Sequence, residues 1–84
     1  MNLLDLPVGQ QGTVHLVRDA QPNDAIARRP RELGFVPGES LRLVTRAPFG
    51  GDPLLVQVGY TRFALRRSEA ERIELERAVE WTLQ

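Results

Sequence analysis

Apolar side chains recur at every second position in several short segments, a spacing that places them on one face of a β-strand. The first such segment covers residues 12–17, where we expect Val14 and Leu16 to share one face and Val17 to lie on the other. Four further segments show the same alternation. One face carries Leu41, Leu43 and Thr45 in the second segment and Leu54, Val56 and Val58 in the third, and we expect Phe63 and Leu65, and then Ile73 and Leu75, to face inward. Five short strands separated by tight turns predict a mainly β fold, a small and strongly bent β-barrel.

Between the first and second strands, residues 22–35 show the features of one short helix. Asn23 or Asp24 can cap its start, because a short side-chain oxygen accepts a hydrogen bond from a free backbone N–H of the first turn. Gly34 suits the left-handed conformation just past the last turn. Pro30 lies in the middle, lacks an N–H and crowds the preceding turn. We therefore expect either a helix kinked at Pro30 or two separate helical turns.

The stretch from Arg46 to Val56 places two glycines, two prolines and an aspartate between two apolar runs. A phosphate-binding loop of the Walker type needs a lysine and a serine or threonine, followed by a helix whose N-terminus receives the anion. This stretch has neither residue type and leads into a predicted strand. It therefore predicts a hairpin loop, in which Gly50 and Gly51 adopt unusual backbone angles. Phe49 at the tip either folds onto the barrel or faces a partner.

Two features lie near the end of the chain. Ser68 and Glu71 match the spacing of a capping box and predict one helical turn before the last strand. Residues 77–84 are ambiguous, because their apolar positions fit a helix but could also continue the last strand. Trp81, the single tryptophan, either covers the core or anchors an association.

The composition argues against several kinds of chemistry. The chain has no cysteine, which rules out disulfides and thiolate metal sites and fits a reducing compartment. His15 is the only histidine, and one histidine with scattered carboxylates does not make a metal site, which usually needs three or four protein ligands. Neither Ser40 nor Ser68 lies close to that histidine in the predicted fold. We therefore expect no catalytic residues, no metal ligands and no cofactor.

Length and hydropathy bound the class of protein. A chain of 84 residues forms one small domain with a thin core. No apolar run approaches the ~18 residues of a membrane span, and the start lacks the basic region and long apolar core of a signal peptide. We therefore expect a cytoplasmic protein that does not insert into the membrane.

The charges balance, with 11 basic and 11 acidic residues, and every basic residue is an arginine. A neutral chain is unfavourable for generic binding to nucleic acid. Two arginine clusters stand out: Arg28, Arg29 and Arg31 in the predicted helix, and Arg66 and Arg67 after the fourth strand. Such clusters either serve solubility or form a patch that recognises an acidic protein surface.

Three motifs occur in order along the chain: ELGFVPGE (Glu32–Glu39), APFGGDP (Ala47–Pro53) and ALRRSEAERI (Ala64–Ile73). In this order and with these gaps, together with the GTV strand, they resemble the FeoA family. The resemblance implies a small SH3-like barrel domain at residues 1–76 and a C-terminal tail at residues 77–84. One position departs from the family pattern, because the family usually has leucine where this chain has Pro30.

The resemblance also implies a function. FeoA proteins are non-enzymatic accessory proteins of bacterial ferrous iron uptake, a transition metal ion process, and act by contact with the cytoplasmic GTP-binding part of the membrane transporter FeoB. We expect a partner to contact the helix, the turn after it and the tip of the 46–56 loop, through Arg28, Arg29, Pro30, Arg31, Phe35, Pro37 and Phe49. The sequence is equally compatible with a monomer and with a weak homodimer.

Two other functions stay open at this point. Similar SH3-like domains form the C-terminal part of iron-dependent repressors, but no helix-turn-helix segment precedes the barrel here, so a regulatory role would need another protein. A small barrel could also bind nucleic acid by stacking bases on aromatic side chains, which would be Phe35, Phe49, Phe63 or Tyr60. The zero net charge argues against this third function.

Overall fold

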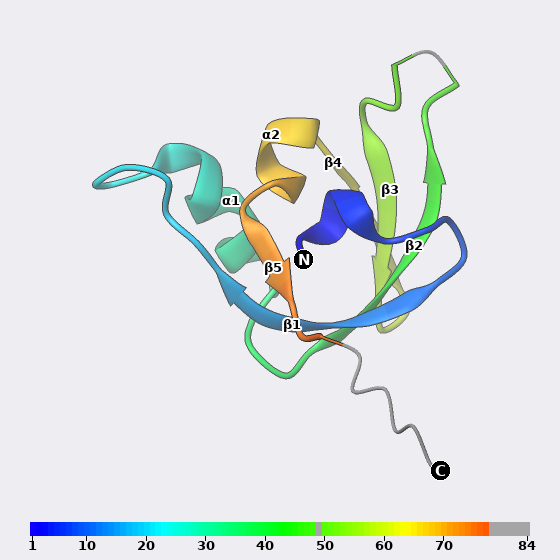
Figure 1. Cartoon of the computed structure of the whole chain (residues 1–84), viewed down its shortest axis with the longest axis horizontal. Coiled ribbons are helices and arrows are strands. Elements are labelled where there is room, and N and C mark those ends of the chain that lie inside the picture. The colour runs from blue at the N-terminus through cyan, green and yellow to red at the C-terminus, as the bar shows by residue number, and fades with distance from the viewer. Residues whose placement is uncertain (49, 78–84) are drawn as a thin grey trace, which may run out of the picture.

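A computed structural model describes residues 1–48 and 50–77 of the chain (Figure 1). The residues at 78–84, including Trp81, and the loop residue Phe49 lie outside this description. The elements in chain order are the 3-10 helix η1 (Leu3–Asp5), β1 (Gln11–Val17), α1 (Ala25–Leu33), β2 (Ser40–Arg46), β3 (Leu54–Val58), β4 (Thr61–Leu65), α2 (Arg67–Ala70) and β5 (Ile73–Leu75). The mainly β fold with a helix between the first two strands is confirmed.

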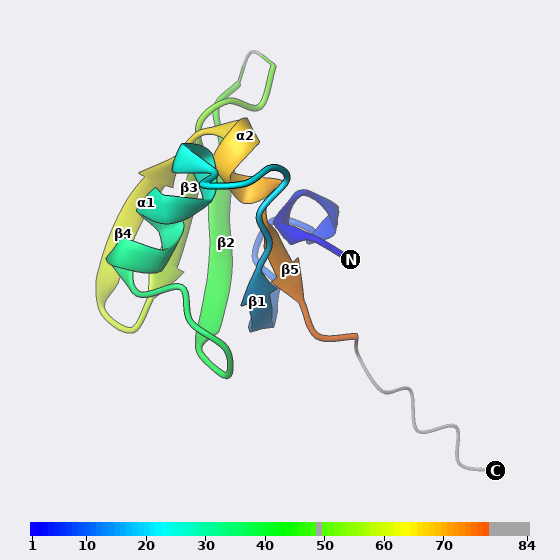
Figure 2. The same ribbon diagram turned by 90° about the vertical axis from the view of Figure 1, so that its left-hand side faces the viewer.

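The five strands form one antiparallel sheet in the order β4-β3-β2-β1-β5. The sheet curls strongly, and α1 and α2 lie next to each other beside it (Figures 1 and 2). The enclosed core contains Leu3, Leu6, Val14, Val17, Ala27, Phe35, Leu41, Leu43, Leu54, Val56, Leu65, Ala70, Ile73 and Leu75. β4 and β5 are the two ends of the sheet. Asn2 forms a β-bridge with Glu74 on the outer side of β5, whereas β4 pairs only with β3 among the described residues.

Irregular pairing changes the inward positions of two strands. In β1, Val14 and Val17 are both buried while Leu16 is only partly buried, so the strict alternation that placed Val17 on the face opposite to Val14 is wrong. The pairing of β1 with β5 shifts register between Val14 and Leu16. In β2, Thr45 is exposed, and the pairing with β3 shifts between Leu43 and Thr45. An extra residue in one strand reverses the alternation beyond it, which a strict period of two does not anticipate.

Helix α1 runs unbroken through Pro30, so the expectation of two separate turns is wrong. Asp24 caps its start, and Gly34 ends it with a φ of 105°. The N–H of Phe35 donates to the carbonyl oxygen of Pro30 over 3.0 Å, which closes the C-terminal turn. The Pro30 ring is fully buried, and we infer that its burial together with the two caps offsets the missing hydrogen bond.

The capping box of α2 lies two residues earlier than expected. The helix begins at Arg67, so Ser68 lies inside it rather than capping it. The residue that reaches back is Glu69, whose carboxylate accepts a hydrogen bond from the backbone N–H of Arg66 over 2.8 Å. The same carboxylate binds Arg29 of α1, a tertiary contact that the local spacing of serine and glutamate does not contain.

Asp24 joins three parts of the chain. Its Oδ1 accepts the N–H of Ile26 over 3.0 Å, and its Oδ2 accepts the N–H of Ala20 over 2.9 Å and the Nε–H of Arg72 over 2.7 Å. The residue is only 2 % exposed. The hydrogen bond from Ala20, followed by the one from Arg72, lowers the pKa of Asp24 from 3.8 to about 2. The loop before α1, the start of α1 and the residue before β5 therefore share one ionised carboxylate.

Replacing this carboxylate by an amide removes its charge. Asparagine caps a helix as well as aspartate does, so Asp24→Asn keeps the cap at Ile26, whereas its NH₂ group replaces the Oδ2 that binds Ala20 and Arg72. Because the folded-state pKa lies below the unfolded one, ionised Asp24 stabilises the fold above pH 3.8, and this contribution is lost as the pH falls towards 2. We expect the wild-type protein to have the higher urea midpoint at pH 6 and the difference to shrink between pH 4 and pH 2. A difference that stays constant over this range would contradict the assignment.

Phe35 lies in the centre of the core rather than on the surface. Its side chain is 0 % exposed, and its ring packs on that of Phe63 with 5.8 Å between the centroids. We expect Phe35→Ala to lower the free energy of unfolding by about 3–5 kcal/mol, the usual cost of emptying a buried aromatic position. Val36→Ala is the matched control, since Val36 is 44 % exposed, and should change stability by less than about 0.5 kcal/mol. Urea denaturation followed by circular dichroism measures both, and similar losses would contradict the burial of Phe35.

Candidate partner-binding site

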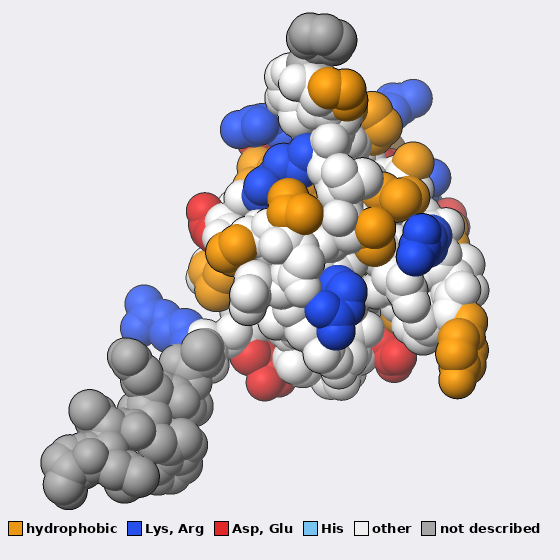
Figure 3. Space-filling model, turned by 90° about the vertical axis from the view of Figure 1, so that its right-hand side faces the viewer, with side chains coloured by type: hydrophobic (Ala, Val, Ile, Leu, Met, Phe, Trp, Pro, Cys, Tyr) orange, Lys and Arg blue, Asp and Glu red, His pale blue; other side chains and the backbone are white. Residues whose placement is uncertain are grey.

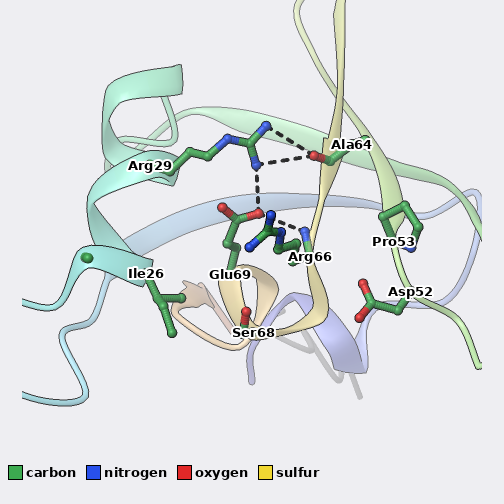
Figure 4. Close-up of a pocket in the computed structure, with 9 residues that line it drawn as sticks. Ile26, Arg29, Asp52, Pro53, Ala64, Arg66, Ser68 and Glu69 are labelled. Carbon is green, nitrogen blue, oxygen red and sulfur yellow. Dashed lines mark hydrogen bonds and ion pairs between the residues drawn. The ribbon is translucent and has the colours of Figure 1, made fainter.

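The face of the molecule in Figure 3 mixes arginine, acidic, hydrophobic and neutral side chains, so charge alone does not mark a site there. A pocket of about 880 Å³ does stand out elsewhere on the surface (Figure 4). It lies where α1, α2, the end of β4 and the turn before β3 meet. Its lining residues are Ala25, Ile26, Arg29, Asp52, Pro53, Ala64, Arg66, Ser68 and Glu69.

Glu69 connects the elements that line the pocket. The residue is only 6 % exposed, and its Oε1 accepts the Nη1–H of Arg29 over 2.7 Å as well as the backbone N–H of Arg66. A buried carboxylate is costly unless it is paired and hydrogen-bonded, and both donors meet that need here. Glu69 therefore fixes α1 against α2 and the end of β4.

Arg29 bridges the pocket from α1 to β4 (Figure 4). Besides Glu69, its Nη1 and Nη2 both face the carbonyl oxygen of Ala64, each at 3.4 Å. These two contacts are longer than an ordinary N–H···O hydrogen bond, whereas the contact with Glu69 is short. The Arg29 side chain is 48 % exposed, so it is firmly held at one side and accessible at the other.

Two further arginines follow β4, and one of them, Arg66, lines the pocket. Arg66 and Arg67 are exposed, and neither guanidinium has an ion pair with any residue that the structure describes. Asp52, which also lines the pocket, accepts the backbone N–H of Arg67 over 3.0 Å. Between these groups lie the small or apolar side chains of Ala25, Ile26, Pro53 and Ala64. The pocket thus combines small or apolar side chains with guanidinium groups that can receive an anionic group.

The residues that the sequence suggested as partner contacts fall into different environments. Pro30 and Phe35 are buried, so their side chains support α1 from the core and do not reach a partner in this conformation. Arg31 is held by Asp19 over 2.9 Å and by the carbonyl oxygen of Val17 over 2.6 Å. Two of the suggested residues are therefore buried, and the third, Arg31, already forms hydrogen bonds within the chain.

The other suggested contacts remain on the surface or outside the described residues. Arg29 lines the pocket, and Arg28 and Pro37 are exposed. Arg28 forms no ion pair within residues 1–48 and 50–77 and does not line the pocket. Phe49 lies outside the residues that the structure describes. Of the six suggested residues that the structure describes, only Arg29 lines the pocket.

Sequence reasoning missed most of the pocket, which Asp52, Pro53, Ala64, Ser68 and Glu69 help to line. The two arginine clusters of the sequence were the usable signals, because one residue of each, Arg29 and Arg66, lines the pocket. Their apolar neighbours come from α1 and from the turn before β3, and the fold alone brings these segments together.

The aromatic side chains that the structure describes do not form an exposed stacking surface. Phe35 is buried, Phe63 is partly buried against it, and Tyr60 is fully exposed in the turn between β3 and β4. The expectation that Phe35 could stack on a base is therefore wrong. Its aromatic surface is already used by the core.

His15 lies on the exposed side of β1, close to Glu74 of β5. A hydrogen bond from Arg18 is the main cause that lowers the pKa of Glu74. Among the described residues, no three or more His, Cys, Asp or Glu side chains form a group that could hold a metal ion. In the same part of the chain, no helix is long and apolar enough to span a membrane.

Comparison with known proteins shows which family the chain is related to. The FeoA domain model matches residues 1–77. FeoA of Stenotrophomonas maltophilia, solved with zinc and described as a prokaryotic SH3 domain protein proposed to activate ferrous iron transport, is 58% identical with a TM-score of 0.81, over 90% of this chain and 89% of that one. FeoA of Chlorobium tepidum is 37% identical with a TM-score of 0.74, over 89% of this chain and 68% of that one.

A different class of protein shares the fold. A manganese-dependent transcriptional repressor bound to manganese is 25% identical with a TM-score of 0.75, and the match covers 90% of this chain but only 35% of the repressor. The comparison with curated proteins gave no significant match. The match of the FeoA domain over residues 1–77, with the SH3-like fold of a relative at 58% identity, shows that this chain belongs to the FeoA family.

Proposed function

We propose that this protein is a non-enzymatic accessory of bacterial ferrous iron uptake, which acts at the cytoplasmic face by contact with the GTP-binding part of a FeoB-type transporter. The observation that carries the proposal is the FeoA match over residues 1–77, together with the relative at 58% identity whose description concerns ferrous iron transport. An accessory of this kind works through its surface. The pocket beside α1 supports such a role, because its apolar side chains and its two arginines, Arg29 and Arg66, suit the binding of a protein segment.

The separation of Ser68 from His15 also supports a binding role rather than catalysis. Ser68 lines the pocket between α1 and β4, whereas His15, the only histidine, lines a different and smaller pocket beside β5. Arg29, which lines the main pocket, is already engaged by Glu69. Arginine does not exchange its proton near neutral pH, so it suits recognition of an anion rather than proton transfer.

The likeness to the repressor favours a second candidate function. In that protein the same fold occupies 35% of a longer chain, which fits a module that senses or transmits a state to another domain. For this protein the corresponding role would be regulation of iron uptake through a separate protein. Binding to the transporter rather than to a transcription factor distinguishes the two candidates.

Isothermal titration of the full chain into the purified cytoplasmic domain of the FeoB-type transporter from the same organism tests the main proposal. We expect a saturable one-to-one complex with a dissociation constant on the order of micromolar, since a small domain offers a modest interface. The titration is run with GDP and with a non-hydrolysable GTP analogue, and an unrelated GTP-binding domain serves as the control. The proposal fails if neither nucleotide state binds, or if the unrelated domain binds equally well.

A further inference from the structure

Strand β4 presents an open main-chain edge. It is the end strand of the sheet and pairs only with β3 among the described residues. Val58 and Thr61 flank the two-residue turn and form a directly hydrogen-bonded pair, so the residues that bond to β3 alternate from there. The N–H and C=O groups of Arg62 and Ala64 therefore point away from β3.

These outward groups have little to bind within the described part of the chain. Only the carbonyl oxygen of Ala64 has a partner, which is the Arg29 guanidinium at 3.4 Å. The N–H of Ala64 and both main-chain groups of Arg62 form no hydrogen bond with the residues that the structure describes. An edge of this kind is the surface to which an extended segment can add as a further strand.

The open edge borders the pocket. Ala64 lines it, and the opposite wall is the start of α1 with Ala25 and Ile26 (Figure 4). A segment that pairs with Arg62 and Ala64 would run between β4 and α1. Because successive side chains of a strand point to opposite sides, one of its side chains would enter the pocket while its neighbours faced outward. The groove thus offers main-chain hydrogen bonds and an apolar recess together.

The charges around the edge select the occupant. Arg62 lies on the strand, Arg66 and Arg67 follow it, and β4 itself carries no acidic residue. The two acids that line the pocket are engaged, Glu69 by Arg29 and Asp52 by the backbone of Arg67. Antiparallel pairing with a second copy would bring two arginine-bearing edges together, and like charges across neighbouring strands are destabilising. An acidic segment of another protein fits the edge better.

We propose that the β4 edge and the adjoining pocket bind an extended, acidic segment of the partner protein by strand addition. This inference rests on the proposed function, because the transporter's cytoplasmic domain supplies the segment. An N–H of the segment replaces Arg29 at the carbonyl oxygen of Ala64, whose present contacts are long. Arg29 keeps Glu69 and, together with Arg66, faces a carboxylate of the segment.

Hydrogen exchange of the wild-type chain tests the strand addition without any substitution. The ¹⁵N-labelled full chain is measured with and without the transporter's cytoplasmic domain. The amides of Thr61, Phe63 and Leu65 bond to β3 and should exchange slowly in both samples. We expect the amides of Arg62 and Ala64 to exchange at least about tenfold more slowly in the complex. A complex that leaves both amides unchanged would overturn the inference but not the proposed function.

A matched pair of substitutions tests the same edge by affinity. Ala64→Pro removes an N–H that points away from β3, and proline is tolerated on the open side of an edge strand. Ala64→Ser keeps the N–H at nearly the same side-chain size. We expect Ala64→Pro to weaken binding at least about tenfold and Ala64→Ser to bind like the wild type. If Ala64→Pro does not fold, Arg62→Pro takes its place, with Arg62→Ala as its control.

A second pair tests the charge. Arg66→Glu and Arg28→Glu change the net charge equally, but only Arg66 lines the pocket. We expect Arg66→Glu to weaken binding at least about tenfold and Arg28→Glu to change it less than about twofold. Equal losses of affinity in the two variants would overturn the inference. A wild-type dimer in analytical ultracentrifugation that Ala64→Pro dissociates would also overturn it, because the β4 edge would then bind a second copy of the chain. No binding by the wild type would instead contradict the proposed function.

Discussion

The buried carboxylate of Glu69 is the constraint on which the arrangement around α1 and β4 depends. An ionised group at 6 % exposure must find donors, and it takes one from the side chain of Arg29 and one from the backbone of Arg66. The first contact draws α1 towards the end of β4, and the second caps α2. The same contact leaves the Arg29 guanidinium beside Ala64, so the shape of the pocket follows from satisfying one charge.

Asp24 plays the matching role at the start of α1. It collects backbone donors from Ala20 and Ile26 and the side chain of Arg72, and is itself almost fully buried. A domain of this length has a thin core and gains limited stability from apolar burial. Two buried acids, each with an arginine from a distant part of the chain, therefore place the single long helix more specifically than apolar contacts alone could. The core residue Phe35 then anchors its other end.

The sequence could predict those features of the fold that depend on residues adjacent in the chain. The alternation of apolar positions found every strand, and Asp24 and Gly34 marked the ends of α1, because strand faces and helix caps are local features. The shifts in β1 and β2 were not predictable, since a bulge depends on the partner strand. Neither was the ion pair of Glu69 with Arg29, which lies forty residues earlier in the chain. Most of the pocket was missed for the same reason, because its walls come from segments that meet only in the fold.

Net charge and local charge lead to different conclusions for this chain. The sum is zero, but Asp19, Asp24, Glu69 and Glu74 are each paired with an arginine inside the fold or along its surface. Several arginines near β4 are left without such partners among the described residues. A neutral molecule generates little long-range attraction, and a polyanion such as nucleic acid depends on that term for most of its affinity. A short-range cluster of guanidinium groups beside an open strand edge acts only on contact, within roughly 10 Å at physiological salt. That combination favours a protein segment that is already held nearby, such as part of a larger complex at the membrane, over a freely diffusing polyanion.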